Sequence, residues 1–238
     1  MGGQALTEGR PGAAGSQLQV ALDRMPLARA VDLAGAVAEH ADWIEVGTSL
    51  IKSHGMAAVV AVAAAAGPTP VLADTKTADD AVTEVDLCHA AGARAMSVLA
   101  LAPDETVRAC VARAGDLGME VLVDLLATGP ERLDALVARL PSASHVVWAA
   151  HVGKDQQERG HPHHALDRMA TRAGGHRLAV AGGLSLADVA ALARSSVNVR
   201  VVVGSAITRA ADPATTAAAF RRLLTVEPPV PSVREATP

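Results

Sequence analysis

Two aspartates and one lysine lie close together in residues 71–79, which read Val-Leu-Ala-Asp-Thr-Lys-Thr-Ala-Asp. Asp74 and Lys76 are two residues apart, so their side chains point to the same side of an extended strand; Asp79 follows three residues later. Charges at the end of an apolar strand are costly to desolvate unless they pair or bind something. The set predicts a site that holds a metal and stabilises a developing negative charge. A structural ion pair at the strand end is the alternative.

A further carboxylate, Glu45, interrupts the apolar run Trp-Ile-Glu-Val at residues 43–46. Magnesium takes oxygen ligands from one or two carboxylates together with substrate oxygens. Glu45 and Asp74 are therefore the candidate ligands of Mg²⁺, with Mn²⁺ as a substitute. A salt bridge from Glu45 to Lys76 is the alternative, and both arrangements can hold at once.

One histidine, His151, ends an apolar run and begins the segment His-Val-Gly-Lys-Asp-Gln-Gln. The ordinary pKa of histidine suits proton transfer near neutral pH, so we expect His151 to be catalytic. Asp155 is a candidate to orient the loop or a substrate hydroxyl, and the role of Lys154 stays open. The segment at 161–164, His-Pro-His-His, is not expected to bind metal, because proline breaks helical spacing and no Cys or carboxylate is adjacent.

Two glycine turns follow the last two apolar runs of the chain. Gly182 and Gly183 follow the first of these runs, and Gly204 with Ser205 follows the second. Turns of this kind grip phosphate through bare backbone N–H groups. No arginine stands directly after either turn, so we expect backbone donors to carry most of the grip on a phosphorylated substrate.

Eight apolar runs typical of buried strands recur along the chain, with helix-like stretches between them. Their carboxyl ends are roughly 22 to 31 residues apart, about the length of one strand–helix unit. Near-continuous Val, Leu and Ala suits parallel strands covered on both faces, and helix starts are expected at Asp104 and Ser185. The runs lie at residues 18–22, 43–46, 70–73, 95–99, 120–123, 145–150, 178–181 and 199–203.

This order predicts an α/β protein with the (β/α)8 TIM-barrel fold, and an open doubly wound sheet is the alternative. Residues 17–225 would form the barrel, residues 1–16 a flexible segment, and residues 226–238 a Pro-rich tail. Active sites of such barrels lie at the carboxyl ends of the strands. Polar or glycine residues stand at these strand ends in this chain: Asp23, Glu45, Asp74, Asp124, His151, Gly182, Gly183 and Gly204. Of these, Asp23 is a further candidate for binding substrate.

Composition excludes several classes of protein. The 238 residues carry a net charge of −4 and almost no aromatic side chains, so neither a basic surface nor stacking platforms for nucleic acid are expected. The apolar run at 56–66 is shorter than the ~20 residues that span a bilayer, and residues 1–16 lack the apolar core of a signal peptide. We expect a cytoplasmic protein without a membrane segment, in which Cys88 and Cys110 are reduced, buried thiols.

These segments resemble the orotidine-5'-phosphate decarboxylase suprafamily of barrels, and within it most of all the 3-hexulose-6-phosphate synthases. The resemblance covers about residues 18–224 and is highly specific for the suprafamily, less so for the reaction. The segments that carry it are residues 18–23, 44–52, 72–79, 151–160, 180–183 and 203–213.

The resemblance implies a Mg²⁺-dependent aldol reaction of formaldehyde with D-ribulose 5-phosphate, which gives D-arabino-3-hexulose 6-phosphate. The metal and Lys76 would stabilise a 1,2-enediolate made from the sugar phosphate, and His151 would move the proton at C1. It also implies a homodimer in which Asp79 reaches the site of the partner subunit.

Some residues depart from the pattern of the synthases. Val152 and Lys154 stand where small or uncharged residues are usual, and basic residues in this loop are typical of 3-keto-L-gulonate-6-phosphate decarboxylase (KGPDC), the runner-up. That enzyme usually has an arginine where Ser205 stands, and Lys52 also favours the synthase. Orotidine decarboxylation is not expected, because Asp80-Ala81 replaces an Ile-Pro pair. A phosphosugar-binding protein without catalysis is the alternative of another class.

Overall fold

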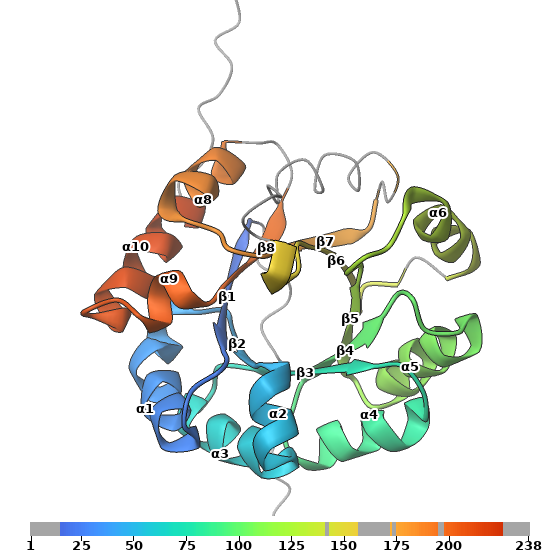
Figure 1. Cartoon of the computed structure of the whole chain (residues 1–238), viewed down its shortest axis with the longest axis horizontal. Coiled ribbons are helices and arrows are strands. Elements are labelled where there is room, and N and C mark those ends of the chain that lie inside the picture. The colour runs from blue at the N-terminus through green and yellow to red at the C-terminus, as the bar shows by residue number, and fades with distance from the viewer. Residues whose placement is uncertain (1–14, 141–142, 157–171, 173–174, 195–197, 226–238) are drawn as a thin grey trace, which may run out of the picture.

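The strands close into a parallel barrel. The computed structural model describes residues 15–140, 143–156, 172, 175–194 and 198–225. Each strand pairs with its neighbours in sequence, and β8 pairs with β1, so the predicted (β/α)8 barrel is confirmed and the open sheet is wrong (Figure 1). The strands are β1 Gln17–Leu22, β2 Trp43–Val46, β3 Val71–Thr77, β4 Ala95–Leu99, β5 Glu120–Asp124, β6 Val146–His151, β7 Arg177–Ala181 and β8 Val199–Val203.

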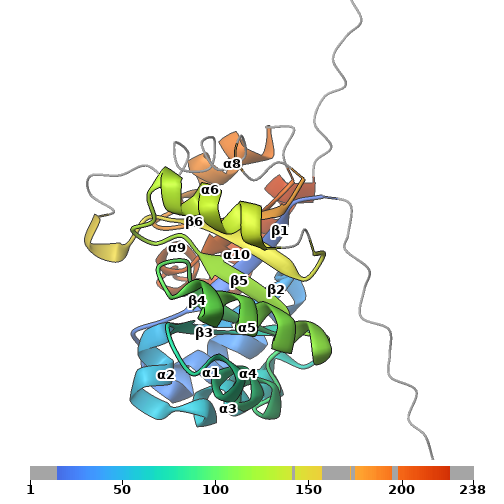
Figure 2. The ribbon, with the colours of Figure 1, turned by 90° about the vertical axis from the view of Figure 1, so that its right-hand side faces the viewer.

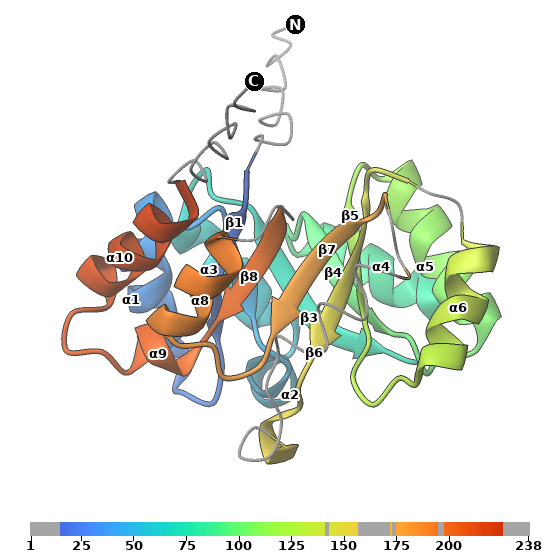
Figure 3. The ribbon, with the colours of Figure 1, turned by 90° about the horizontal axis from the view of Figure 1, so that it is seen from above.

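Helices form a ring around the barrel in the described part of the chain (Figure 1), and α4, α5 and α6 follow one another across its outer face in Figure 2. The arrowheads of β6 and β7 point to the end where α2 and η2 lie (Figure 3). The helices are α1 Leu27–Val37, η1 Ala38–His40, α2 Thr48–His54, α3 Met56–Ala66, α4 Ala81–Ala90, α5 Asp104–Asp116, α6 Pro130–Arg139, η2 Lys154–Gln156, α8 Leu186–Ala193, α9 Ser205–Thr208 and α10 Pro213–Thr225.

The strands are apolar on both faces because each face is buried. Side chains that point outward from the sheet pack with the helices in one large core. Those that point inward form a second, smaller cluster, which fills the barrel below its carboxyl end. Its members are Trp43, Leu72, Ala95, Leu122, Val147, Ala149 and Ala179.

A buried arginine closes the amino-terminal end of the barrel. Arg200 is 3% exposed, and its guanidinium lies 4.3 Å from the centre of the Trp43 ring. It donates to Glu120 Oε2 at 2.6 Å and to Gln17 Oε1 at 3.2 Å. A buried cation is tolerated only when it is paired and hydrogen-bonded in this way.

The predicted helix starts have different outcomes. Ser185 begins α8 with a reciprocal capping box to Asp188, as predicted. Asp104 also begins its helix, α5, but does not cap it, because Pro103 holds the cap position without a side-chain bond. The Asp104 carboxylate instead pairs with Arg132 and Arg139 of α6.

The apolar run at 56–66 forms α3, which packs against α1. In the part of the chain that the structure describes, no single helix is long and apolar enough to cross a membrane; α2 and α3 together pass that test by length and composition, but they are bent by 118°. Cys88 and Cys110 are free and buried, as expected. Burial raises the pKa of each thiol to about 12, which makes both unreactive.

The largest difference from the sequence prediction lies in β3. The strand was expected to end at Ala73, but it continues to Thr77. Its register against β4 shifts between Ala73 and Thr77, so the charged segment is an irregular part of the strand itself. The terminal predictions for residues 1–14 and 226–238 lie outside the described residues.

Candidate active site

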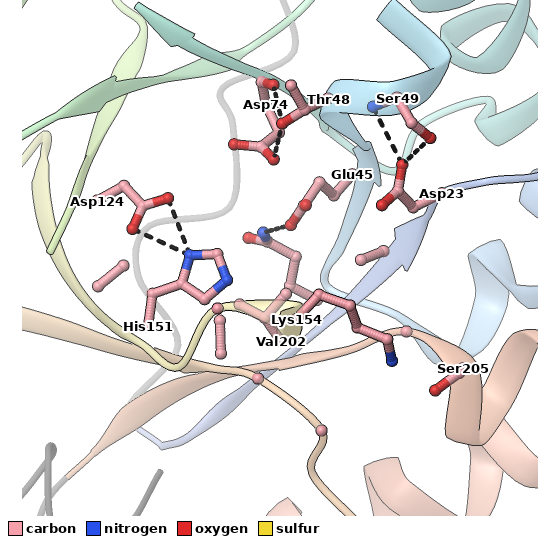
Figure 4. A pocket seen from close by; sticks show the side chains of 18 of the residues that line it. Asp23, Glu45, Thr48, Ser49, Asp74, Asp124, His151, Lys154, Val202 and Ser205 are labelled. Atoms are coloured by element: carbon pink, nitrogen blue, oxygen red, sulfur yellow. Dashed lines mark hydrogen bonds and ion pairs between the residues drawn. The ribbon is translucent and has the colours of Figure 1, made fainter. Parts of the chain in front are cut away.

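A cavity of about 410 Å³ opens at the carboxyl ends of the strands. Figure 4 shows side chains from several strands around it, with Asp124 and His151 on one side and Asp23 and Ser205 on the other. Most of the predicted site residues line the cavity: Asp23, Glu45, Asp74, Lys76, His151, Gly182, Gly183, Gly204 and Ser205.

Three donors hold the Asp74 carboxylate at the edge of this cavity. Thr48 Oγ1 donates to Oδ2 at 2.6 Å, and Ser97 Oγ donates to Oδ1 at 2.7 Å. Lys76 Nζ donates to the same Oδ1 at 3.0 Å. Because both oxygens accept a fixed donor, the carboxylate has little freedom to rotate, and only its remaining lone pairs are available to a ligand.

The Lys76 ammonium bridges two carboxylates. Its Nζ lies 3.0 Å from Asp74 Oδ1 and 2.7 Å from Asp124 Oδ2. Burial disfavours the charged form, but the charges of Asp74 and Asp124 outweigh burial and raise the pKa of Lys76 above its ordinary value. The amine is therefore a fixed cation at neutral pH. The second carboxylate beside Lys76 is therefore Asp124, to which the sequence analysis gave no role.

Asp124 also holds His151. The ring Nδ1 lies 3.0 Å from both oxygens of Asp124, and the Leu126 N–H donates to Asp124 Oδ1 at 2.9 Å. Burial disfavours the carboxylate, yet the bond to His151 and the charges of His151 and Lys76 lower the pKa of Asp124 to about 2. An ionised Asp124 places the proton on Nδ1 and leaves Nε2 as the basic atom.

The bond to Asp124 in turn acts on the basicity of His151. Burial lowers the pKa of the imidazole, but the hydrogen bond and the charge of Asp124 raise it above the ordinary value of 6.5. Sequence reasoning placed Asp124 at a strand end without giving it a role. The signal was present, because an aspartate directly after a buried Val-Leu-Val run is expensive unless it is paired.

Glu45 is the least compensated carboxylate of the cavity. Its Oε2 accepts a hydrogen bond from Gln19 Nε2 at 2.5 Å, whereas Gln19 Oε1 is buried without a partner. Burial and the nearby charge of Asp74 raise the pKa of Glu45 to about 8. Among the described residues the ion pairs of Lys76 are with Asp74 and Asp124, so the alternative salt bridge from Glu45 to Lys76 is wrong.

These oxygens fit a hard cation. Glu45 and Asp74 repel each other, and an orphaned amide oxygen is available on Gln19. Bound Mg²⁺ would relieve both features, since it prefers oxygen ligands and commonly uses one or two carboxylates. In the described ranges no group of three or more His, Cys, Asp or Glu side chains is arranged to hold a metal, so other ligands would come from substrate or water.

The Asp23 carboxylate is fixed by the start of α2. Its Oδ1 accepts hydrogen bonds from the backbone N–H of Ser49, at 3.1 Å, and from the Ser49 hydroxyl. A Cβ at Gly47 would lie 2.8 Å from the Asp23 carboxylate. Only glycine at position 47 lets β1 and α2 approach closely enough for this contact, which the sequence prediction missed.

The glycine turn after β7 packs against the loop that follows His151. Gly182 has a φ of +117°, and a Cβ there would overlap with the Val152 carbonyl oxygen. Cations also line this cavity, among them Lys154 and Arg209, and the Lys154 side chain runs toward Ser205 in Figure 4. An arginine thus lines the same cavity as the predicted phosphate grip, although none stands directly after either glycine turn.

Two predicted site residues are not brought into the cavity. Asp79 and Asp155 are both exposed, and neither lines the cavity in this chain. The segment His161–His164 lies outside the described residues.

The chain is similar to known proteins over nearly its whole barrel. It is 36% identical over 209 residues to the 3-hexulose-6-phosphate synthase of Mycobacterium gastri, covering 86% of this chain and 98% of that protein. The crystal structure of 3-hexulose-6-phosphate synthase from Salmonella typhimurium superposes with a TM-score of 0.80 at 36% identity, covering 87% of this chain and 97% of that one.

A related branch is also similar. The crystal structure of KGPDC from Streptococcus mutans, solved as a ligand complex, matches with a TM-score of 0.77 at 26% identity, covering 87% of this chain and 96% of that one. The model of the Orotidine 5'-phosphate decarboxylase / HUMPS family matches residues 16–220. This chain belongs to that family.

Proposed function

We propose that the protein is an aldehyde-lyase that condenses formaldehyde with D-ribulose 5-phosphate to D-arabino-3-hexulose 6-phosphate. The observation that carries this proposal is the arrangement of Lys76 and His151 on one buried carboxylate, Asp124. It puts a fixed cation and a proton acceptor side by side in a cavity with glycine turns. The named synthases to which the chain is similar catalyse this class of reaction.

His151 and Lys76 divide the chemistry between them. With Nδ1 bonded to Asp124, Nε2 of His151 accepts the proton from C1 of the sugar phosphate. The electrons of that C–H bond move into the carbonyl, and Lys76 stabilises the oxyanion of the enediolate. C1 then forms the new bond to formaldehyde, and His151 returns its proton to the oxygen of the former aldehyde.

Glu45 and Asp74 would hold Mg²⁺, or Mn²⁺ in its place. When bound, the ion would polarise the substrate oxygens and so acidify the C1 proton. The Gly182–Gly183 turn and the Gly204–Ser205 turn would bind the phosphate, with Lys154 and Arg209 nearby. Asp23, held by Ser49, would orient a sugar hydroxyl, and Asp155 would act on the loop after β6.

The active form in this proposal is a cytoplasmic homodimer. Asp79 is exposed in one chain, which suits a residue that reaches across to the partner's site. Residues 1–16 and 226–238 would be appendages of a single barrel domain.

Decarboxylation of a 3-keto sugar acid phosphate is the second candidate. Lys154 in the cavity wall favours it, since a basic group in this loop is typical of KGPDC. A phosphosugar-binding protein without catalysis is the third, and the complete set of Lys76, Asp124 and His151 weighs against it.

One pair of assays tests the proposal. Purified protein with Mg²⁺ is given formaldehyde and ribulose 5-phosphate, and separately 3-keto-L-gulonate 6-phosphate. Consumption of formaldehyde without release of CO₂ is the expected result. Exchange of the C1 proton of ribulose 5-phosphate into D₂O separates an enzyme from a binding protein. Release of CO₂ with no use of formaldehyde would assign the second candidate.

A further inference from the structure

The Lys76 backbone adopts a conformation that its own strand does not support. Its φ is +49°, in the left-handed region that side chains other than glycine rarely adopt. The β3–β4 ladder is interrupted here, because Ala73 pairs with Met96 and Thr77 next pairs with Val98. Three residues of β3 therefore lie opposite one residue of β4, which is Ser97.

The Ser97 hydroxyl replaces the missing ladder bond. It accepts a hydrogen bond from the Lys76 N–H at 2.9 Å and donates its proton to Asp74 Oδ1 at 2.7 Å. Ser97 is 0% exposed, so bulk water does not reach its side chain. A single buried hydroxyl thus ties the backbone of the lysine to the carboxylate with which that lysine pairs.

The surrounding side chains do not duplicate this link. Thr75 Oγ1 donates to the Ser97 carbonyl oxygen at 2.9 Å and lies 3.0 Å from Thr77 Oγ1. These bonds anchor the irregular segment to β4 but touch neither Asp74 nor the Lys76 N–H. Thr48 holds the other Asp74 oxygen, Oδ2.

We infer that Ser97 is a positioning residue, which sets the place of the Lys76 ammonium and of the Asp74 carboxylate for the reaction. Without its hydroxyl, the half-buried Lys76 N–H loses its partner, and a donor left without a partner favours relaxation of the segment toward regular strand. The side chain of Lys76 then leaves the line between Asp74 and Asp124. The role in the reaction rests on the proposed function; the role in the geometry does not.

The test compares Ser97→Ala with Thr75→Val. Both variants remove one hydroxyl from the same contact between β3 and β4, but only the first removes the bonds to Asp74 and to the Lys76 N–H. Ser97→Ala is expected to lower kcat by about 10²-fold, because a misplacement near 1 Å has that effect. The KM for ribulose 5-phosphate should stay within about threefold, since the phosphate grip lies at β7 and β8. Thr75→Val should keep kcat within about threefold.

The crystal structure of Ser97→Ala gives a measurement that does not depend on activity. We expect Lys76 to leave its left-handed conformation, or Nζ to move away from Asp124. Should Ser97→Ala not fold, Ser97→Cys replaces it, with a kcat loss of at least about tenfold expected because a thiol is a poor donor and acceptor.

Two results would overturn the inference. One is a folded Ser97 variant with kcat within about threefold of the wild type. The other is a Ser97→Ala structure with Lys76 in its original conformation and both ion pairs intact. A wild-type protein inactive on formaldehyde and ribulose 5-phosphate would instead refute the proposed function, and the structure of the variant alone would then decide the role of Ser97.

Discussion

Asp124 lies between Lys76 and His151, with Oδ2 at 2.7 Å from the lysine ammonium and at 3.0 Å from the imidazole Nδ1. One carboxylate thus sets the charge of the cation and the tautomer of the base. The Lys76 ammonium and the His151 imidazole are therefore held at a fixed separation, and a substitution of one is expected to change the pKa of the other.

Replacing Lys76 by alanine should abolish most of the catalysis while substrate still binds. A preorganised donor to a developing oxyanion is worth about 3–4 kcal/mol, or ~10²–10³ in kcat. Asp74 and Asp124 are left without their cation, so the variant must be shown to fold by thermal melt. A folded variant with kcat within about threefold of the wild type would make the ion pairs purely structural.

Replacing Asp124 by asparagine should shift the pH dependence of catalysis. In the proposed mechanism His151 acts as a base in its neutral form, so kcat/KM should fall at pH values below the pKa of His151. Asp124 raises that pKa above 6.5, and its neutral replacement should therefore move the acidic limb of the kcat/KM profile to lower pH. A profile with an unmoved acidic limb would show that His151 is not the titrating base.

The same variant should change stability in acid. The pKa of Asp124 is lowered from 3.8 to about 2, so its pairing stabilises the fold above pH 3.8 and is lost as pH falls through about 2. Wild-type Tm should therefore drop faster than that of Asp124→Asn in this window. The opposite sign applies to His151, whose raised pKa adds stability that is lost as pH rises through it. Parallel melting curves for the two proteins would contradict the assigned pairing.

Excess EDTA should remove activity, and Mg²⁺ or Mn²⁺ should restore it. A melt without substrate provides the control: Mg²⁺ should raise the Tm of the wild type by mass action but not that of Glu45→Gln, because the glutamine removes one proposed ligand. Full activity in EDTA would exclude the metal.

Gly182→Ala should raise the KM for ribulose 5-phosphate by at least about tenfold, since the added methyl meets the Val152 carbonyl and the turn must move. Gly118→Ala is the matched control. Gly118 also has a positive φ, of +65°, but nothing lies within 4 Å of the added Cβ, and it precedes β5 at the other end of the barrel. Equal effects of both variants on KM would assign the change to backbone strain alone.

Mixing two inactive variants tests whether Asp79 acts across the dimer. In a heterodimer of Asp79→Asn with Lys76→Ala, one site receives an intact Lys76 and an intact Asp79 from different chains. Random exchange of subunits should then recover about a quarter of wild-type activity. If Asp79 acts within its own chain, no mixed site is intact and activity stays absent.

Much of the barrel could be predicted from the sequence because its strands are buried on both faces. The apolar run at residues 199–203, for instance, predicted both ends of β8 correctly, even though Arg200 lies inside it. The irregular part of β3 could not be predicted, since residues 74–76 carry no glycine or proline that marks a bulge. Because the bulge was not predicted, the contacts of Ser97 with Lys76 and Asp74 were not predicted either.

The contact between Lys76 and Asp124 could not be predicted from the sequence either. The two residues are 48 positions apart and meet only because β3 and β5 end at the same rim of a closed barrel. Separation in sequence favours the prediction of local contacts, whereas closure of the barrel determines which carboxylates from distant strands come together. Asp79 and Asp155 stay predictions, which the dimer experiment and loop variants can test.

Arg200, Trp43 and the inward-facing apolar cluster fill the barrel beneath the cavity, so in the part of the chain that the structure describes the cavity is closed at its base. Substrate and product must therefore pass through the same opening. In the proposed function the hexulose phosphate leaves by the route through which the pentose phosphate enters, and both would bind their phosphate at the same glycine turns. The product should therefore be a competitive inhibitor against ribulose 5-phosphate. When product accumulates, the rate should depend on the concentration of the sugar phosphate rather than on that of formaldehyde.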